Sequence, residues 1–197
     1  MARFLLGQHN ITCEDVVRIA FGKAPVELDK SAVEKLPKGR KVDMSAAHER
    51  ILAKYNAISL LKSGPVVVPH IRALVFVRIR TLLEGQTQLR AEVVQFLVGL
   101  LNENITPVIS VDDQSLYQLA LFLDPKCAGK FINSAGKEVF GEGLGLAKLV
   151  APGLSPQEIV TVVQGHSAGA ALSCLAGSAL GNLLNLADTV AALACEA

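Results

Sequence analysis

The sequence predicts a mainly α-helical domain with helical hairpins, minor short β elements and a long C-terminal helix rich in Ala and Gly. Two observations carry this prediction: apolar residues recur near the 3.6-residue helical period within 69–109, and residues 159–187 are apolar and small with no charge. A chain of 197 residues is long enough to bury one large core. We expect a single domain with four parts, namely N-terminal helices (1–64), a helical hairpin (65–109), a loop-rich segment (110–155) and a long helix (156–197).

The hairpin is the best-marked part of the chain. Pro69 suits the first turn of a helix, Gly85 suits the end of that helix, and residues 102–104 followed by Pro107 suit the end of a second helix. Between these boundaries, the apolar positions with helical spacing are Ile71, Leu74, Val75, Ile79, Leu82 and Leu83, then Leu89, Val93, Phe96, Leu97, Leu100 and Leu101. The pattern predicts two buried helices.

Other segments have weaker boundaries of the same kind. Thr12 is expected to cap a short helix, because Thr-x-x-Asp precedes an apolar run. Residues 26–28 are expected to be extended, 45–62 helical, and the valines between Pro65 and Pro69 an extended linker. A surface loop or small hairpin is expected at 126–130 and 133–136. Ser155 and Pro156 are expected to begin the last helical region, Ser155 as its cap.

Composition limits the function classes. A net charge of +1 with 19% charged residues gives no electrostatic basis for binding nucleic acid or an anionic membrane surface. A hydrophobic content of 51% and a mean hydropathy of +0.41, with no Trp, indicate apolar surface available for a protein interface. The four cysteines have no paired or metal-ligand spacing, which predicts free thiols in an intracellular, reducing compartment. Residues 1–10 lack a secretory cleavage pattern, and the sequence does not distinguish the cytoplasm from the mitochondrion.

The exact residues of the hairpin resemble those of the aromatic amino acid ammonia-lyases, the histidine and phenylalanine ammonia-lyases. The matching residues are Arg72 and Ala73, 78–83, Gly85, 90–93 and 101–107. The resemblance continues more weakly over 8–39 and 116–197, so it covers most of the chain. It implies the N-terminal, mainly helical portion of a lyase, because the sequence ends before the helical region that supplies most of the tetramer core in that family.

The residues that would carry lyase chemistry are changed. In active members, Ala-Ser-Gly after the hairpin cyclises to a methylidene-imidazolone electrophile, for which the glycine allows close backbone approach and the serine supplies the methylidene. Here residues 107–116 contain Ser110, Asp112 and Asp113 but no Ala-Ser-Gly. The family's Tyr-Gly-x-Asn-Thr-Gly loop is also missing, and Tyr55 lies within a predicted helix without those glycines.

A third departure lies at the start of the last helix. Active lyases carry Asn-Gly-Thr there, whereas this chain has Gln164, Gly165 and His166. We therefore expect a pseudoenzyme without a cofactor, which acts as a structural or interaction subunit of a larger assembly. One alternative is a split or truncated lyase whose second chain supplies the missing residues.

A second alternative is a serine hydrolase using Ser167, because residues 165–169 fit G-x-S-x-G after an apolar segment. Against it, no histidine follows Ser167, and the adjacent His166 cannot act as its base. Metal binding is not expected either, since the four histidines have no ligand spacing, and Asp112 with Asp113 fits a solvated turn.

The uncharged stretch 159–187 is long enough for a membrane span, but Gln164, His166, Asn182 and Asn185 and its many small residues favour a protein helix. Small residues let helices approach closely. We expect protein partners, either another copy or other chains, to pack on Gly169, Ala176, Gly177, Leu180, Gly181 and Leu184.

Overall fold

The computed structural model describes residues 3–7, 10–22, 24–37, 67–85, 89–109, 115–123, 129–140 and 151–196. Helices dominate these residues, and the strands are short. In chain order, the elements are β1 (Phe4–Leu6), α1 (Cys13–Gly22), β2 (Val26–Leu28), α2 (Lys30–Glu34), α4 (Val68–Glu84), α5 (Ala91–Asn102), β3 (Thr106–Pro107), α6 (Ser115–Phe122), β4 (Lys130–Ile132), β5 (Glu138–Phe140), α7 (Pro156–Val163) and α8 (Ser167–Glu196).

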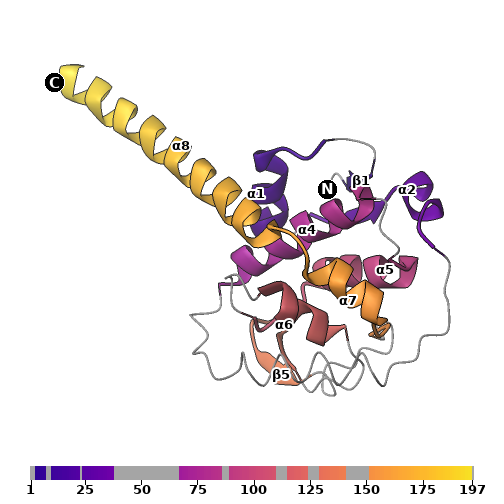
Figure 1. The fold of residues 1–197 in the computed structure, drawn as a ribbon. Coiled ribbons are helices and arrows are strands. Elements are labelled where there is room, and N and C mark those ends of the chain that lie inside the picture. The colour runs from indigo at the N-terminus through magenta and orange to yellow at the C-terminus, as the bar shows by residue number, and fades with distance from the viewer. Residues whose placement is uncertain are drawn as a thin grey trace.

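Helix α4 is the centre of the molecule, with α1, α5 and the first part of α8 packed around it (Figure 1). The predicted hairpin is therefore confirmed, and its boundaries are those expected: Pro69 lies in the first turn of α4, Gly85 is its C-cap, and α5 ends at Asn102. The apolar positions with helical spacing predicted a buried helix, and this is confirmed. Residues 71–76 of α4 are all buried, which adds Ala73, Phe76 and Arg72 to the predicted positions, and Arg78 is buried as well.

The N-terminal strands and helix pack on one side of α4. Strand β1 pairs in parallel with β2, which confirms the extended segment expected at 26–28. Thr12 and Asp15 form the predicted cap of α1, since the Asp15 backbone N–H donates to Thr12 Oγ1 and the Thr12 N–H donates to Asp15 Oδ2. The helix expected at 45–62 lies outside the described residues.

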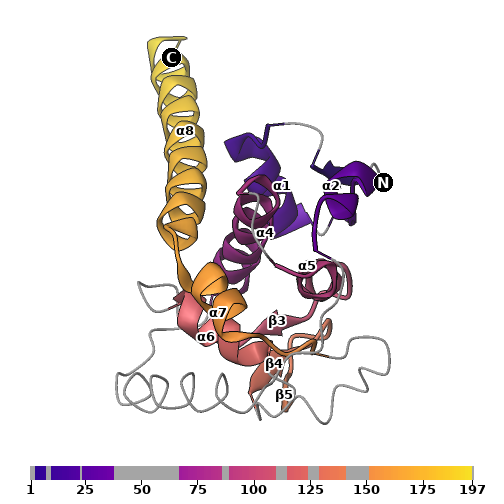
Figure 2. The same cartoon turned by 45° about the vertical axis from the view of Figure 1, so that its right-hand side comes forward.

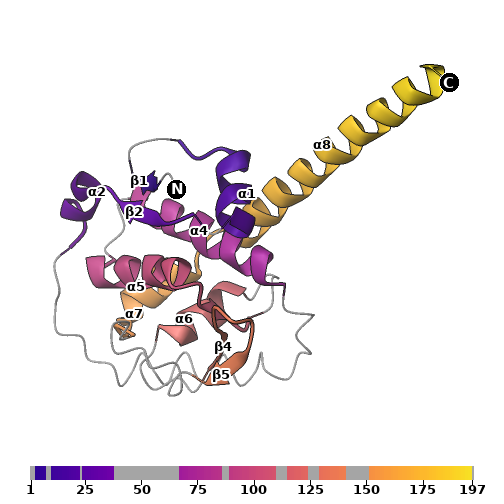
Figure 3. The same ribbon diagram turned by 180° about the vertical axis from the view of Figure 1, so that it is seen from behind.

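Figures 2 and 3 show the small elements α6, α7 and β3–β5 together at one end of the molecule, below α4 and α5. Strand β4 pairs antiparallel with both β3 and β5. The β4–β5 turn confirms the hairpin expected near residue 133, and Gly136 adopts the positive φ of 76° that the turn requires. The segment 110–155, expected to be rich in loops, also contains helix α6.

The long helix expected at 156–197 is divided into two. Helix α7 begins with the predicted cap, because the Ser155 side chain accepts from the Glu158 backbone and Glu158 bonds the Ser155 backbone in return. Residues 164–166 interrupt the helix, and α8 leaves in another direction. From its base against α1 and α4, α8 projects far beyond the rest of the molecule (Figure 1).

Candidate functional site

The turn between α7 and α8 brings together the residues with the most unusual environments. Ser167, the first residue of α8, is only 2% exposed. Its Oγ accepts a hydrogen bond of 3.5 Å from Arg78 Nη1 and lies 3.4 Å from Thr81 Oγ1. Arg78 and Thr81 come from α4, so the central helix and the start of α8 meet here.

Arg78 is the charged member of this cluster. Its Nη2 donates to the carbonyl of Thr161 in α7, while its buried Nε has no hydrogen-bond partner. Burial lowers the pKa of the Arg78 guanidinium to about 10, so its charge is retained at neutral pH. A buried arginine bound to helix ends holds α7 and α8 in place on α4.

The backbone conformation at position 165 of this turn favours glycine. Gly165 has a φ of +121°, a conformation that other residues rarely adopt. A Cβ at this position would lie 2.9 Å from Arg78 Nη1. The glycine thus permits both the sharp change of direction and the close approach of the arginine.

The polar neighbours of Gly165 face elsewhere. Gln164 and His166 are both exposed, and no hydrogen bond links either side chain to Arg78 or Ser167 among the described residues. Gln164 and His166 are two of the five positions at which the sequence differs from the catalytic motifs of the lyases, and the structure places both on the surface of this chain. The others, Ser110, Asp112 and Asp113, lie outside the described residues.

Residues 165–169 fit G-x-S-x-G, but the interpretation of this segment as the nucleophile turn of a serine hydrolase is wrong. That motif needs a strand, a strained turn and a helix, but the segment before Ser167 is helix α7. Ser167 is buried instead of exposed at a turn, and its hydrogen-bonding neighbours are an arginine and a threonine, neither of which can act as a general base. Its small side chain serves packing at the start of α8.

A second polar cluster joins α5 to α7. Glu158 is 3% exposed, and its carboxylate accepts bonds from Arg90 Nε at 2.8 Å, Arg90 Nη2 at 3.1 Å and the backbone N–H groups of Arg90 and Ser155. Arg90 also donates to the carbonyls of Pro152 and Gly153. Burial by itself raises the pKa of Glu158, but the bonds from Arg90 and Ser155 outweigh it and leave the pKa below its usual 4.5. The cluster is a structural junction.

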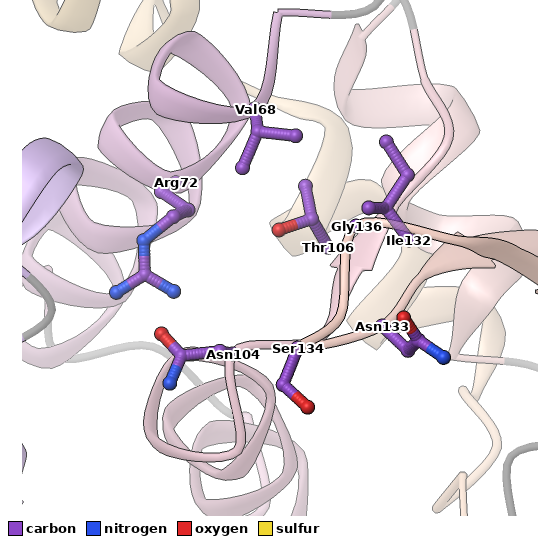
Figure 4. Close-up of a pocket in the computed structure, with 8 residues that line it drawn as sticks. All are labelled: Val68, Arg72, Asn104, Thr106, Ile132, Asn133, Ser134 and Gly136. Atoms are coloured by element: carbon purple, nitrogen blue, oxygen red, sulfur yellow. The ribbon is translucent and has the colours of Figure 1, made fainter.

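One small cavity of about 130 Å³ lies beside α4, where the chain leaves α5 and enters β3. Figure 4 shows Arg72 and Asn104 on one side of it and the β4–β5 turn on the other. The Arg72 guanidinium is already bonded to the carbonyls of Ile19 and Leu101, and the buried Asn104 Oδ1 has no partner. The cavity is smaller than ordinary small-molecule sites, which span roughly 300–1,000 Å³.

Asn104 has the conformation of a residue that follows the end of a helix. Its φ is +53°, which places it in the left-handed region just after the C-cap Glu103. The Ile105 N–H returns to the Leu100 carbonyl at 2.9 Å, as expected for a helix that ends in this way. Among the described residues, no group of His, Cys, Asp and Glu is suited to a metal ion.

The family model for aromatic amino acid lyases matches residues 43–197 of this chain. The chain belongs to the aromatic amino acid lyase family. The resemblance identified from the hairpin residues is thereby confirmed, and so is the helical fold that it implies.

Curated relatives and solved structures agree with the family assignment. The histidine ammonia-lyase of Streptomyces griseus is 27% identical over 238 residues, an alignment that takes in 100% of this chain and 45% of that enzyme. The crystal structure of histidine ammonia-lyase from Trypanosoma cruzi has a TM-score of 0.72 at 18% identity, covering 89% of this chain and 39% of that one. Phenylalanine ammonia-lyase from Rhodosporidium toruloides has a TM-score of 0.67 at 21% identity and matches 89% of this chain and 31% of its own.

The chain thus spans a little under half the length of the lyases it matches. The family's electrophile does not fit this sequence, because Ala-Ser-Gly occurs nowhere in the 197 residues. Residues 108–114 connect β3 to α6 where the resemblance places that loop, and they contain no glycine for the ring closure.

Proposed function

We propose that this chain is a catalytically inert member of the aromatic amino acid lyase family and acts as a structural or interaction subunit. The observation that carries the proposal is the exposed, apolar length of α8. Leu180, Leu183, Leu184, Leu186, Val190 and Leu193 are each 58–62% exposed. A helix that leaves this much apolar surface uncovered is suited to a partner.

The apolar residues of α8 follow a regular order. Positions 176, 180, 183, 187, 190 and 194 alternate in steps of four and three, and all six are exposed and apolar. This is the spacing at which two helices pack along a common seam. We call these six residues the α8 seam.

The other side of the same helix is polar. Asn182, Asn185, Asp188 and Thr189 lie away from the seam in helical projection, and the seam itself has no charge. At the base of α8, Ala171 and Leu175 are buried against the rest of the chain. The helix is therefore anchored by one side near its beginning and presents another side further out.

The small residues expected to admit a second helix are consistent with this proposal. An added Cβ at Gly169, Gly177 or Gly181 would meet no atom within 4 Å. Ala176, Leu180 and Leu184 are exposed in the same part of the helix. Within the described part of the chain these positions are available, and their packing against a partner remains a prediction.

The experiment measures assembly with a matched pair of charge substitutions. We expect Leu183→Asp, on the seam, to weaken association at least about tenfold, because a charge would be buried without a partner. Asn185→Asp adds the same charge on the polar side and should leave assembly unchanged. Native mass spectrometry of the gently purified full chain, with co-purifying proteins identified, distinguishes self-association from recruitment by other chains.

Two results would contradict the interaction role. One is a wild-type chain that stays monomeric and co-purifies with nothing; the other is equal assembly in both variants.

A separate measurement tests whether α8 binds a membrane. Within Pro156–Cys195, a window of 18 residues has the mean hydropathy, 1.4, of a membrane span, and 11% of that window is buried. If the wild-type chain partitions into lipid vesicles and Asn185→Asp does not change this, the surface that covers α8 is a lipid bilayer and not a protein.

The alternative is one part of an aromatic amino acid lyase that a second chain completes. It is favoured by the alignment of all of this chain with 45% of a histidine ammonia-lyase. A co-purifying chain with an Ala-Ser-Gly loop, together with ammonia release by the complex and not by either chain alone, would establish it. A complex without such a chain supports the inert subunit.

A further inference from the structure

Two cysteines that are far apart in the sequence meet in the fold. Cys13 is the first residue of α1, and Cys174 lies in the first part of α8, 161 positions later. Both are free thiols, and Cys13 Sγ donates a hydrogen bond to Cys174 Sγ at 3.0 Å. Helices α1 and α8 pack side by side at this point, as Figures 1 and 3 both show.

We propose that Cys13 and Cys174 form a redox-active dithiol, which a low-molecular-weight disulfide such as glutathione disulfide converts into an intramolecular disulfide joining α1 to α8. The inference does not depend on the proposed function, since it concerns only contacts within this chain. It assigns a modification site to two residues whose sequence spacing suggested no relation.

The geometry favours the bond. A disulfide needs a sulfur separation of about 2.05 Å, so the two atoms must approach by only about 1 Å. The partners come from helices already packed against each other, and Cys174 also packs on the hydrophobic core. The thiols therefore stay close without ordering any further segment, which gives them a high effective concentration.

The two thiols differ in access, which sets the order of events. Cys13 is exposed and open to a soluble disulfide, whereas Cys174 is half-buried. Burial, followed by the hydrogen-bond and charge interactions with Cys13, raises the pKa of the Cys174 thiol to about 11, which makes it a poor first nucleophile. We expect the small disulfide to react with Cys13 first.

The exchange balances in two steps. The Cys13 thiol loses its proton to solvent and its sulfur attacks one sulfur of glutathione disulfide, which forms a mixed disulfide and releases one glutathione thiolate. The Cys174 thiol then loses its proton, and its sulfur attacks Cys13 Sγ and displaces the second glutathione thiolate. Two protein thiols are oxidised, one glutathione disulfide is reduced, and the two thiolates take up the two protons.

The product would change the protein in a defined way. A disulfide between residues that are 161 positions apart closes most of the chain into one loop, which strongly restricts the conformations of the unfolded state. It would also fasten the base of α8 to α1, so that the projecting part of α8 leaves the molecule at a set angle. Reduction by glutathione reverses both effects.

The test uses the full chain equilibrated in glutathione buffers from fully reduced to fully oxidised. Samples are quenched with N-ethylmaleimide and digested without reduction for peptide mass mapping. We expect a linked peptide containing Cys13 and Cys174, an intact chain that lacks the two N-ethylmaleimide adducts of the reduced form, and a rise in the thermal midpoint of about 5 °C or more. All three should disappear on reduction.

Serine variants identify the pair. Cys13→Ser and Cys174→Ser should each abolish the linked peptide and the thermal shift, while Cys195→Ser, at the exposed end of α8, should keep both. Because the peptide map of the wild-type chain needs no variant, poor folding of one variant cannot decide the result. The proposal is overturned if Cys13 and Cys174 are still free thiols in oxidising buffer and therefore alkylated at the quench. It is also overturned if they carry separate glutathione adducts or pair with other cysteines.

Discussion

Gly165 is the residue on which the junction between α7 and α8 depends. Its φ of +121° and the 2.9 Å between a notional Cβ and Arg78 Nη1 exclude a side chain for two separate reasons. The buried Arg78 guanidinium could yield only by giving up its bonds to Thr161 and Ser167. One backbone position therefore sets the direction in which a 30-residue helix leaves the molecule.

The first prediction compares two glycines of this region. Gly165→Ala should lower the free energy of unfolding by about 1–3 kcal/mol, because alanine is strained at positive φ. Gly177→Ala should raise it by about 0.5–1 kcal/mol, because Gly177 is exposed inside a helix with open space around it. Urea unfolding of dilute protein measures both values. Equal effects of the two substitutions would contradict the assignment.

The second prediction concerns Glu158, whose pKa is held below its usual 4.5 mainly by Arg90 and Ser155 against the opposing effect of burial. A lowered folded pKa stabilises the protein above the unfolded value, and this contribution is lost as pH falls from about 4.5 through the folded pKa. Glu158→Gln should lower the free energy of unfolding at neutral pH by about 2–3 kcal/mol and remove this part of the acid dependence.

Glu138 offers the matched control. Its side chain is 57% exposed and pairs with Lys130 at 3.4 Å across the β4–β5 hairpin. Glu138→Gln should change the free energy of unfolding by less than about 0.5 kcal/mol. If the free energy of unfolding of Glu158→Gln stays parallel to that of the wild type as the pH falls below about 5, Glu158 does not titrate as proposed.

At the scale of elements, α8 consists of two parts with different support. Its first turns pack against α1 and α4 through Ala171 and Leu175, while every side chain described from residue 182 onward is exposed. Isolated helices in water are only marginally stable, and tertiary packing supplies most of their stability. Under the proposed function, a partner that covers the α8 seam would stabilise this projecting part.

A third prediction follows for hydrogen exchange. In the free chain, amides in 182–195 should exchange at least about tenfold faster than those in 168–178, because nothing in the described chain covers them. Hydrogen-exchange mass spectrometry of the wild-type chain, alone and in its assembly, checks this. The difference should disappear in the assembly, and protection of 182–195 in a free monomer would contradict the two-part description.

At the scale of the whole molecule, the chain has the helical fold of the lyases, and Ala-Ser-Gly does not occur in its 197 residues. The central hairpin, its buried arginines and the start of α8 form the framework of this fold. This separation is expected because fold and function rest on different residues. Under the proposed function, this scaffold supplies a binding helix and no catalysis.

The fourth prediction tests that separation. The purified chain should release no ammonia from histidine, phenylalanine or tyrosine, with a histidine ammonia-lyase assayed alongside as a positive control. The double substitution Gln164→Asn with His166→Thr should restore nothing, because Ala-Ser-Gly is missing. Ammonia release by the wild-type chain alone would overturn the assignment as an inert subunit.

Several parts of the fold could be predicted from local sequence. The ends of α4, the cap at Thr12, the capping box at Ser155 and the β4–β5 turn were all recognisable. Each depends on residues within a few positions of one another, whose hydrogen bonds and allowed φ values act at short range. The family likewise followed from local motifs along the hairpin.

By itself, then, the sequence determined the helical class, the hairpin boundaries, the family and the absence of Ala-Ser-Gly from these 197 residues. Tertiary structure alone decided that residues 71–76 of α4 are buried all round, that Ser167 meets Arg78, that α7 and α8 part at Gly165, and that Cys13 lies against Cys174. These features join residues from distant parts of the chain. Their positions depend on how whole helices pack, and no local pattern contains that information.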